Sequence, residues 1–314
     1  MEFRNVGESG LKVSIFGLGG WTTFGDLVKD KKVVRDIIYK AHDYAVNYYD
    51  MADVYAFGQA EKLMGEVLKD FPRHTLVLAT KVFWPMSEDV NDKGLSRKHI
   101  IESIDRSLKR IGTDYVDIYY CHRYDPEVPI EEVLRAMDDL VHQGKILYWG
   151  TSMWEFKQIQ EAFLLCERYG LYKPIVEQPI YNLIIQDHFE KEVKPAINKY
   201  KIGAIVFSPL LSGVLTGKYD DGIPKGSRLE KYEEVRQRHY KEEVIEKVKK
   251  FKKIADKVGC TRAQLALAWL KKREGVTSII LGATKVSQLE ENLKAYSIEL
   301  DDSVMKKIDN LFSA

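Results

Sequence analysis

The sequence contains few cysteines and no long hydrophobic run. Its three cysteines, Cys121, Cys166 and Cys260, are widely spaced and include no CxxC pair. We therefore expect a reducing compartment and no zinc site. The longest uncharged stretch, residues 202–217, is interrupted by proline and glycine. This stretch is too short and too broken to span a bilayer.

Neither sign of charge is in excess. Lys and Arg total 48 and Asp and Glu total 47, which gives a net charge of +1. Proteins that bind nucleic acids or membrane surfaces need a clustered basic face, so no nucleic-acid partner is predicted. The charged run at residues 242–253 is most simply a solvated helix face.

The N-terminal segment lacks the apolar core of a signal peptide. It carries four charged residues instead, Glu2, Arg4, Glu8 and Lys12. Because a secretory signal needs an apolar stretch at this point, we expect a soluble, cytoplasmic protein without membrane insertion.

The sequence does contain a regular alternation of short apolar runs and helical patterns. Residues 3–6 and 11–16 flank a glycine-containing turn and predict an N-terminal β-hairpin. Eight strand–loop–helix units then follow, and no composition shift or linker divides them. This pattern predicts a (β/α)8 TIM barrel forming a single domain over residues 1–314. The predicted strands cover residues 16–18, 48–50, 76–80, 116–120, 146–149, 175–177, 204–207 and 278–281.

Capping patterns mark several of the predicted helices. Ser96 is a plausible N-cap for a helix that runs to Ile111. Two capping-box spacings, which begin at Thr261 and Ser287, open the last helices. Residues 211–240 break the rhythm as a long excursion rich in glycine, proline and charge. Loops of this length are usually functional or disordered, and we expect a lid that clamps a ligand.

Four reactive side chains fall at the carboxyl ends of predicted strands or just beyond them. They are Asp50, Tyr55, Lys81 and His122. On a barrel these ends face one mouth, so the four side chains are expected to converge. Bringing a tyrosine pKa from ~10 toward neutrality takes about 3 units, or roughly 4 kcal/mol. Lys81 could supply this by favouring the phenolate, while Asp50 orients Lys81 and His122 binds a substrate carbonyl.

Each of these features has a simpler interpretation. Asp50 could cap the next helix while Tyr55 packs on its flank, and Asp53 is explained well enough as a helix cap. The glycines at 17, 19 and 20 suggest a dinucleotide loop, but no third glycine opens a helix, so a tight turn is expected. Trp21 and Trp84 could be core aromatics, although their loop positions favour the walls of a substrate pocket. The other six histidines are expected at the surface or in caps, and no metal site is predicted.

The stretch Asp-Met-Ala-Asp-Val-Tyr at residues 50–55, followed by Lys81 and His122, resembles the catalytic tetrad of the aldo-keto reductases. The likeness runs from the N-terminal hairpin almost to the end of the chain. Within that superfamily the chain is most similar to the branch that contains the voltage-gated potassium-channel β subunits. The segments that carry this likeness are residues 19–25, 94–102, 212–213, 217–220 and 281–283.

One departure from that branch bears on function. Mammalian channel β subunits carry asparagine where this chain has His122, the histidine of the more active reductases. The sequence also shows no long N-terminal extension that could plug a channel pore. Both points favour a metabolic enzyme. The alternative is a channel-β-subunit-like regulatory or nucleotide-sensing protein with slow reductase activity.

The resemblance also implies a cofactor and a substrate class. It implies NADPH as hydride donor, with NADP+ as product, and reduction of a small carbonyl substrate by Tyr55 as general acid. Met153 departs from the Asn or Arg often found at its position, and the channel-subunit likeness is compatible with a homotetramer. The implied substrate pocket is Trp21, Tyr55, Trp84 and His122. The implied cofactor-binding residues are Gly20, Trp21, Asp50, Ser152, Gln178, Phe207, Ser208, Leu210, Ser212, Gly213, Lys218, Arg228, Gly282, Thr284, Gln288, Glu291 and Asn292.

Overall fold

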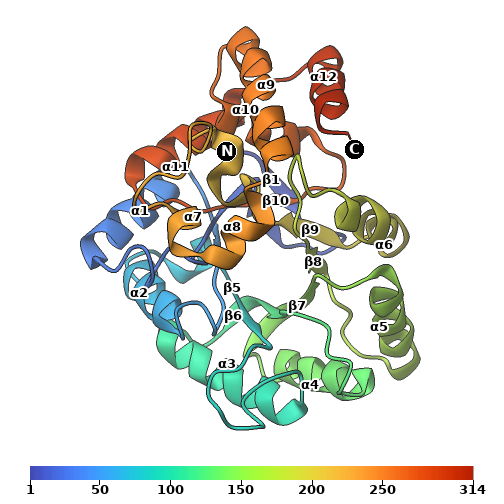
Figure 1. Ribbon diagram of the computed structural model, residues 1–314. Helices are drawn as coiled ribbons and strands as arrows, with labels where there is room; N and C mark the ends of the chain where they lie inside the picture. Colours follow the sequence, from blue (N-terminus) through green and yellow to red (C-terminus); the bar gives the residue numbers. More distant parts are fainter. Residues whose placement is uncertain (314) are drawn as a thin grey trace.

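A closed barrel of parallel strands forms the centre of the computed structural model, which describes residues 1–313 (Figure 1). The strands follow one another around the barrel in chain order, and the last pairs with the first to close it. Together with the surrounding helices, this confirms the predicted (β/α)8 fold. The barrel strands are β3 (Phe16–Gly19), β4 (Tyr48–Asp50), β5 (Val77–Val82), β6 (Val116–Cys121), β7 (Ile146–Ser152), β8 (Val176–Gln178), β9 (Gly203–Val206) and β10 (Ser278–Leu281).

Alternation along the strands determines which side chains enter the barrel. In β4 the side chain of Tyr48 packs inside with Val77, Ile118 and Tyr120, whereas Tyr49 packs outward in the helix-facing core. Because side chains of a strand alternate between its two faces, Asp50 has the same inward direction as Tyr48. The reactive side chains of this strand and its neighbours therefore sit on top of an apolar plug.

The N-terminal hairpin closes the other end of the barrel. Strand β1 (Phe3–Asn5) pairs antiparallel with β2 (Lys12–Ser14), which confirms the predicted hairpin. The apolar run 11–16 is divided, however, because β2 ends at Ser14 and β3 begins two residues later. Val6 and Val13 lie in the interior cluster of the barrel, so the hairpin covers the amino-terminal ends of the strands.

Helices form the outer ring, and most of their predicted ends hold. The hydroxyl of Ser96 accepts from the amide of His99 at 3.2 Å, as an N-cap does. The capping box that begins at Thr261 is present in full. The ring contains α1 (Lys31–Asp43), α2 (Gln59–Leu68), α3 (Arg97–Ile111), α4 (Ile130–His142), α5 (Phe156–Tyr169), α6 (Lys194–Tyr200), α10 (Arg262–Lys272) and α11 (Val286–Leu293).

The second predicted capping box is wrong. Helix α11 begins at Val286 with Lys285 as its N-cap, so Ser287 lies inside the helix. The side chain of Gln288 instead accepts hydrogen bonds from the amide and the hydroxyl of Thr284, both at 2.9 Å. This bond shapes the connection after β10. Two further helices, α9 (Glu242–Val258) and α12 (Asp302–Phe312), pack on each other, with Phe251 against Phe312.

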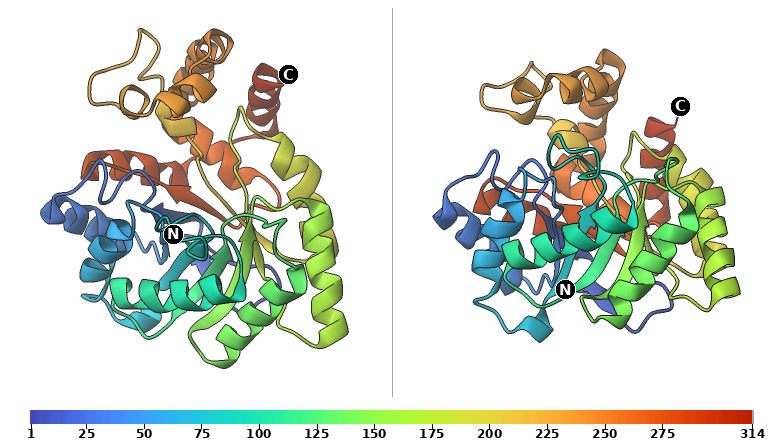
Figure 2. Two further views of the ribbon diagram at one scale, coloured as in Figure 1. Left: turned by 60° about the horizontal axis from the view of Figure 1, so that its bottom comes forward. Right: turned by 90° about the horizontal axis from the view of Figure 1, so that it is seen from below.

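The excursion at residues 211–240 contains short helices rather than an irregular loop. They are η3 (Leu211–Thr216), α7 (Arg228–Lys231) and α8 (Glu233–His239). In Figure 2 this gold-to-orange segment stands out from the barrel, at the end opposite the N-terminal hairpin. Within residues 1–313 no helix is both long and apolar enough to cross a membrane.

Candidate active site

A large cleft opens at the carboxyl ends of the barrel strands. Its volume is about 1240 Å³, above the ~300–1,000 Å³ of typical drug-sized ligand sites. Among its lining residues are Tyr55, Trp84 and His122. Lys81 is fully buried just behind the wall. Of the residues predicted to bind the cofactor, every one except Gly20 lines this cleft: Trp21, Asp50, Ser152, Gln178, Phe207, Ser208, Leu210, Ser212, Gly213, Lys218, Arg228, Gly282, Thr284, Gln288, Glu291 and Asn292.

Gly20 lies behind the cleft rather than on its wall. Its amide donates to the carbonyl of Asp50 at 2.9 Å, so it fixes the chain leaving β3 against the chain leaving β4. A Cβ at this position would lie 3.0 Å from the sulfur of Met64. The close approach of α2 leaves little room for a side chain at Gly20. This residue therefore contributes to the cleft by holding the ends of β3 and β4 together, rather than by lining it.

The four reactive side chains converge at the floor of the cleft. The ammonium of Lys81 donates to a carboxylate oxygen of Asp50 at 2.7 Å and to the phenol oxygen of Tyr55 at 3.0 Å. It also donates to the carbonyl of Met51 at 2.6 Å. The ring of His122 meets the ring of Tyr55 edge-on, with centroids 5.8 Å apart. Asp50 therefore does not cap a helix, and the phenol and the imidazole both line the cleft.

Burial determines the charge states of these groups. It raises the pKa of Tyr55 well above its ordinary value of 10, and the charge of Asp50 raises it further. Burial therefore outweighs any lowering of this pKa by Lys81, and the expectation that Lys81 brings the pKa of Tyr55 toward neutrality is wrong. Burial also lowers the pKa of His122 well below 6.5, and the positive charges of Lys81 and Arg123 add to this effect. The floor thus presents a neutral phenol and a neutral imidazole.

A polar row continues from this floor across the barrel. The side-chain amide of Gln178 donates to the second carboxylate oxygen of Asp50 at 2.8 Å, and the hydroxyl of Tyr48 donates to the same oxygen at 3.1 Å. The hydroxyl of Ser152 donates to the backbone carbonyl of Gln178 at 2.8 Å. Ser152 and Gln178 are thus adjacent on β7 and β8, with parts of both facing the cleft.

The wall beyond β9 combines unusual backbone conformations with a buried polar group. Four consecutive or nearly consecutive residues there, Ser208, Leu211, Ser212 and Gly213, have positive φ values. Such backbone is strained for residues other than glycine and is common at ligand sites. The hydroxyl of Ser212 is buried and has no hydrogen-bond partner among residues 1–313. An orphaned donor in a strained loop fits a bound polar group such as a phosphate.

Two cations lie farther along the cleft. Lys218 is exposed and Arg228 is half-buried, and neither forms a salt bridge in the part of the chain that the structure describes. The guanidinium of Arg228 lies 5.9 Å from the ring of Trp21. These free charges suit an anionic ligand, and they extend the polar wall from β9 to α7.

Comparison of the sequence with known protein families agrees with the barrel and its cleft. The profile of the aldo/keto reductase family matches residues 16–312. The chain belongs to the aldo/keto reductase family. It is 45% identical over 321 residues to a protein of Arabidopsis thaliana named as a probable voltage-gated potassium channel subunit beta, with 100% of this chain and 97% of the relative covered. A protein of the same name from Oryza sativa subsp. japonica is 44% identical over 316 residues, with 98% and 96% covered.

These relatives confirm the resemblance to the branch with channel β subunits. The roles of individual residues in this aldo/keto reductase remain predictions, because a match over the whole chain assigns no role to a single side chain. The structure nevertheless places the predicted substrate-pocket tryptophans at the surface of the cleft: Trp21 is 41% exposed and Trp84 is 37% exposed. The ring of Trp84 stands edge-on to His122 at 6.3 Å, so neither tryptophan belongs to the core.

Sequence reasoning missed several residues of the aldo/keto reductase cleft. Arg123 is the most notable, because it directly follows His122 and its side chain reaches the same wall. Its position after the predicted histidine was a usable signal. Three of the others, Lys225, Arg238 and His239, lie in the excursion at residues 211–240 that was expected to clamp a ligand, although they were not named individually. The additional lining residues include Asp26, Leu27, Ile180, Ile185, Lys225, Arg238, His239 and Lys285.

Asp53 is not the helix cap that was expected. Its carboxylate is fully buried, and it accepts from the amide of Val54 at 2.6 Å and from the hydroxyl of Ser103 at 2.8 Å. Burial raises its pKa to about 7, and the charge of Glu61 contributes. Glu61 is itself buried and pairs with Arg110 at 2.5 Å. This network lies under the loop that carries Tyr55 and fixes it to α3.

Two histidines also differ from expectation, since His99 and His239 are buried. Both ring nitrogens of His99 lack a hydrogen-bond partner within residues 1–313. Burial lowers the pKa of both imidazoles, in His239 to about 4. Neither is therefore a charged group at neutral pH.

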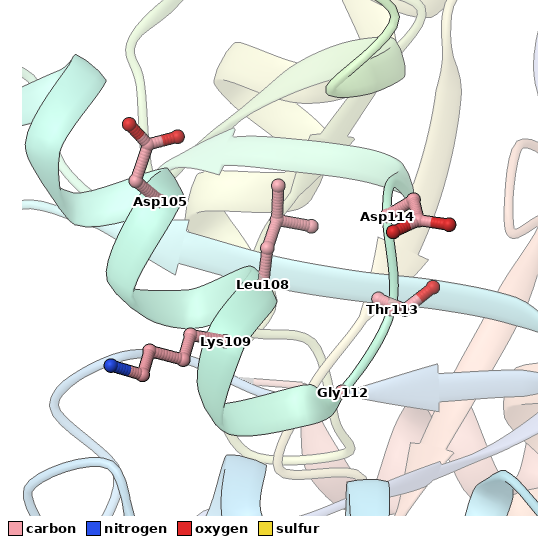
Figure 3. Close-up of a pocket in the computed structure, with 6 residues that line it drawn as sticks. All are labelled: Asp105, Leu108, Lys109, Gly112, Thr113 and Asp114. Carbon is pink, nitrogen blue, oxygen red and sulfur yellow. The ribbon is translucent and has the colours of Figure 1, made fainter.

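A second hollow lies at the opposite end of the barrel. It is formed by the last turn of α3 and the connection to β6, with a volume of about 500 Å³. Figure 3 shows the side chains of Asp105, Leu108, Lys109, Thr113 and Asp114 around it. Because sites in such barrels form at the carboxyl ends of the strands, this hollow at the amino end of β6 is not the candidate site.

Proposed function

We propose that this aldo/keto reductase reduces aldehydes or ketones to alcohols with NADPH as hydride donor. The observation that carries the proposal is the contact of Lys81 with both Tyr55 and Asp50 at the floor of the cleft. When bound along the cleft, NADPH supplies the hydride that reduces the carbonyl carbon. The protein must then deliver a proton to the carbonyl oxygen, and we assign this role to Tyr55.

Each residue of the floor has a distinct role in this proposal. Tyr55 stays protonated because its pKa is raised, so it carries the proton that a general acid must deliver. As its proton leaves, the adjacent ammonium of Lys81 stabilises the phenolate. Asp50 opposes the effect of burial on Lys81, whose pKa burial lowers, and so keeps it charged. Neutral His122 orients the carbonyl oxygen by hydrogen bonding.

The cofactor assignment rests on the residues of the wall. Ser152 and Gln178 would hold the nicotinamide carboxamide, and Phe207 would stack beneath the ring. The strained loop would hold the pyrophosphate through the hydroxyl of Ser212, which has no hydrogen-bond partner within residues 1–313. The cations Lys218 and Arg228 would bind the remaining phosphate charge, which favours NADPH over NADH.

Steady-state oxidation of NADPH with a panel of aldehydes and ketones tests the proposal. We expect absorbance loss at the NADPH band that depends on the carbonyl compound and yields the matching alcohol. Tight NADPH binding without turnover of any carbonyl compound would contradict it.

A second candidate function is regulation of a membrane protein by a nucleotide-sensing subunit. The names of the relatives favour it, since proteins 44% and 45% identical to this chain are named as channel β subunits. His122 and its contact with Tyr55 favour the enzyme instead. Slow turnover of every carbonyl compound, together with tight cofactor binding, would favour the subunit.

A further inference from the structure

Arg123 is a cation in the cleft that the proposed chemistry does not use. It directly follows His122, and its guanidinium carbon lies 5.6 Å from the ring of Trp84. One of its terminal nitrogens, Nη1, donates to the backbone carbonyl of His122 and lies 3.5 Å from the hydroxyl of Ser152. Arg123 thus lies between the predicted substrate wall and the predicted nicotinamide contacts.

Most of the hydrogen-bonding capacity of Arg123 is unused. A guanidinium has five N–H donors, and both recorded contacts of Arg123 involve Nη1. Within residues 1–313, its Nε and Nη2 atoms make no hydrogen bond and its side chain forms no salt bridge. The Nε and Nη2 edge can bind a carboxylate through two parallel hydrogen bonds.

The carboxyl of Glu177 could act as an internal counter-ion, since its charge opposes the effect of burial, which lowers the pKa of Arg123, but it is already engaged. Its carboxylate is fully buried and accepts from the hydroxyl of Thr151 at 2.5 Å and from the amide of Trp154 at 3.2 Å. Burial raises the pKa of Glu177 to about 8, so this group is largely neutral at pH 7. A partly buried cation without an anion is costly, and the missing charge is expected to come from a ligand.

We propose that Arg123 binds the carboxylate of the substrate, so that the preferred substrates are aldehydes or ketones that also carry a carboxylate. This inference rests on the proposed reductase function. The carbonyl oxygen would lie between Tyr55 and His122, with the carboxylate on the neighbouring guanidinium and Trp84 covering the chain between them. Arg123 determines substrate specificity in this scheme and takes no part in proton or hydride transfer.

Two observations favour a substrate carboxylate over a phosphate. Two other cations, Lys218 and Arg228, are predicted to hold the cofactor phosphates. They belong to the excursion at residues 211–240, which forms a different part of the cleft wall. Near Arg123, the ammonium of Lys81 is committed to Asp50 and Tyr55. A single free guanidinium matches one negative charge better than the two of a phosphate monoester.

The test compares matched charged and neutral substrates in the full-length protein. The pairs are succinic semialdehyde with butanal, and 4-carboxybenzaldehyde with methyl 4-formylbenzoate. Wild-type kcat/KM should favour the charged member of each pair. Arg123→Gln should reduce that preference about 10- to 100-fold, the range of a charge-assisted hydrogen bond, mainly through a higher KM. Arg123→Lys should retain part of it.

The control variant is Arg135→Gln, which removes an arginine from an exposed position on α4. It should leave the preference unchanged. The dissociation constant of NADPH should be the same in Arg123→Gln and wild type. Equal kcat/KM for charged and neutral substrates, an equal loss on both in Arg123→Gln, or a preference for phosphorylated aldehydes would overturn the inference while the reductase proposal stands.

A binding measurement separates the inference from the reductase proposal. Titration calorimetry with the unreactive pair benzoate and benzamide, at saturating NADP+, should show tighter binding of benzoate by wild type. Arg123→Gln should lose the difference. If no carbonyl compound is reduced, the reductase proposal fails, and the benzoate result then decides the carboxylate site by itself. Equal binding of the two compounds by wild type would overturn it.

Discussion

The ammonium of Lys81 donates to the phenol oxygen of Tyr55 at 3.0 Å, from a position with no solvent exposure. Tyr55→Phe removes the proposed proton donor but keeps the ring, and Lys81 retains its bonds to Asp50 and Met51. We expect the fold to survive and single-turnover carbonyl reduction at saturating NADPH to fall by ~10²–10⁴. Wild-type rates in this variant would mean that the acid lies elsewhere, with His122 as the next candidate.

Lys81→Met should differ from Tyr55→Phe in stability as well as in rate. It removes the ammonium that stabilises the phenolate, so turnover should also be crippled. It further leaves Asp50 buried without its cation, and breaking a buried pair costs about 3–5 kcal/mol. Thermal unfolding should therefore occur at a lower temperature in Lys81→Met and at nearly the wild-type temperature in Tyr55→Phe. Equal melting temperatures for the two variants would contradict this account.

The reduction rate should show no histidine titration near neutral pH. Burial lowers the pKa of His122 well below 6.5, so its imidazole is neutral between pH 6 and pH 8. Tyr55 remains protonated over the same interval because its pKa is raised. Single-turnover rates should be flat from pH 6 to pH 8, and His122→Asn should be slower but equally flat. A change in the single-turnover rate near pH 6.5 that is absent in His122→Asn would show that this histidine does titrate there.

Cofactor choice should depend on Arg228. A charge-assisted contact contributes about 1.5–3 kcal/mol, so NADPH should bind roughly ten- to a hundred-fold more tightly than NADH. Arg228→Gln should reduce this ratio and leave the affinity for NADH nearly unchanged. Arg236→Gln is the matched control, because Arg236 pairs with Glu233 and does not line the cleft. Equal affinities of the wild-type protein for the two cofactors would remove the prediction.

The arm formed by residues 211–240 should be protected by cofactor. Asp26, on the loop after β3, accepts hydrogen bonds from Lys231 and Tyr232 of the arm, so these contacts connect the two sides of the cleft. Trypsin should cleave the arm in the free protein and more slowly with NADPH, and Asp26→Ala should weaken this protection. Asp187→Ala, at an exposed ion pair, is the control. If trypsin cleaves the arm at the same rate with and without NADPH, the arm does not clamp the cofactor and only connects β9 to α9.

The site residues that could be predicted are those fixed by strand periodicity. Asp50 and Lys81 are at the ends of β4 and β5, on the faces that point into the barrel, and His122 directly follows β6. Alternation determines which face such a residue occupies, and the parallel barrel brings the strand ends together. The local sequence was therefore enough to predict that these three side chains meet at the carboxyl-terminal end of the barrel.

The residues that could not be predicted depend on distant packing. Nothing near Asp53 in the sequence indicates that Ser103, fifty positions away, donates a hydrogen bond to its carboxylate. The pKa of Tyr55 likewise depends on burial by the whole floor. In the arm, helices α7 and α8 are 4 and 7 residues long, too short to produce a clear apolar period among glycines and charged residues.

Asp53 should make stability depend on pH. Its pKa is about 7 in the folded protein against an ordinary 3.8, so the folded state binds the proton more tightly than the unfolded chain. Its stabilising contribution is therefore complete below pH 3.8 and is lost as the pH rises to about 7. A shift of this size corresponds to about 4 kcal/mol at most. Asp53→Asn cannot ionise, and its amide can keep both partners, Val54 and Ser103.

Urea unfolding of the wild type and Asp53→Asn at pH 4 and pH 8 measures this effect. The free energy of unfolding of the wild type should fall relative to that of Asp53→Asn as the pH rises. Asp187→Asn provides the control, because Asp187 is exposed and its loss should not alter the slope. If the wild-type and Asp53→Asn curves run parallel from pH 4 to pH 8, the carboxyl of Asp53 ionises alike in the folded and unfolded chain, and the buried network does not hold its proton.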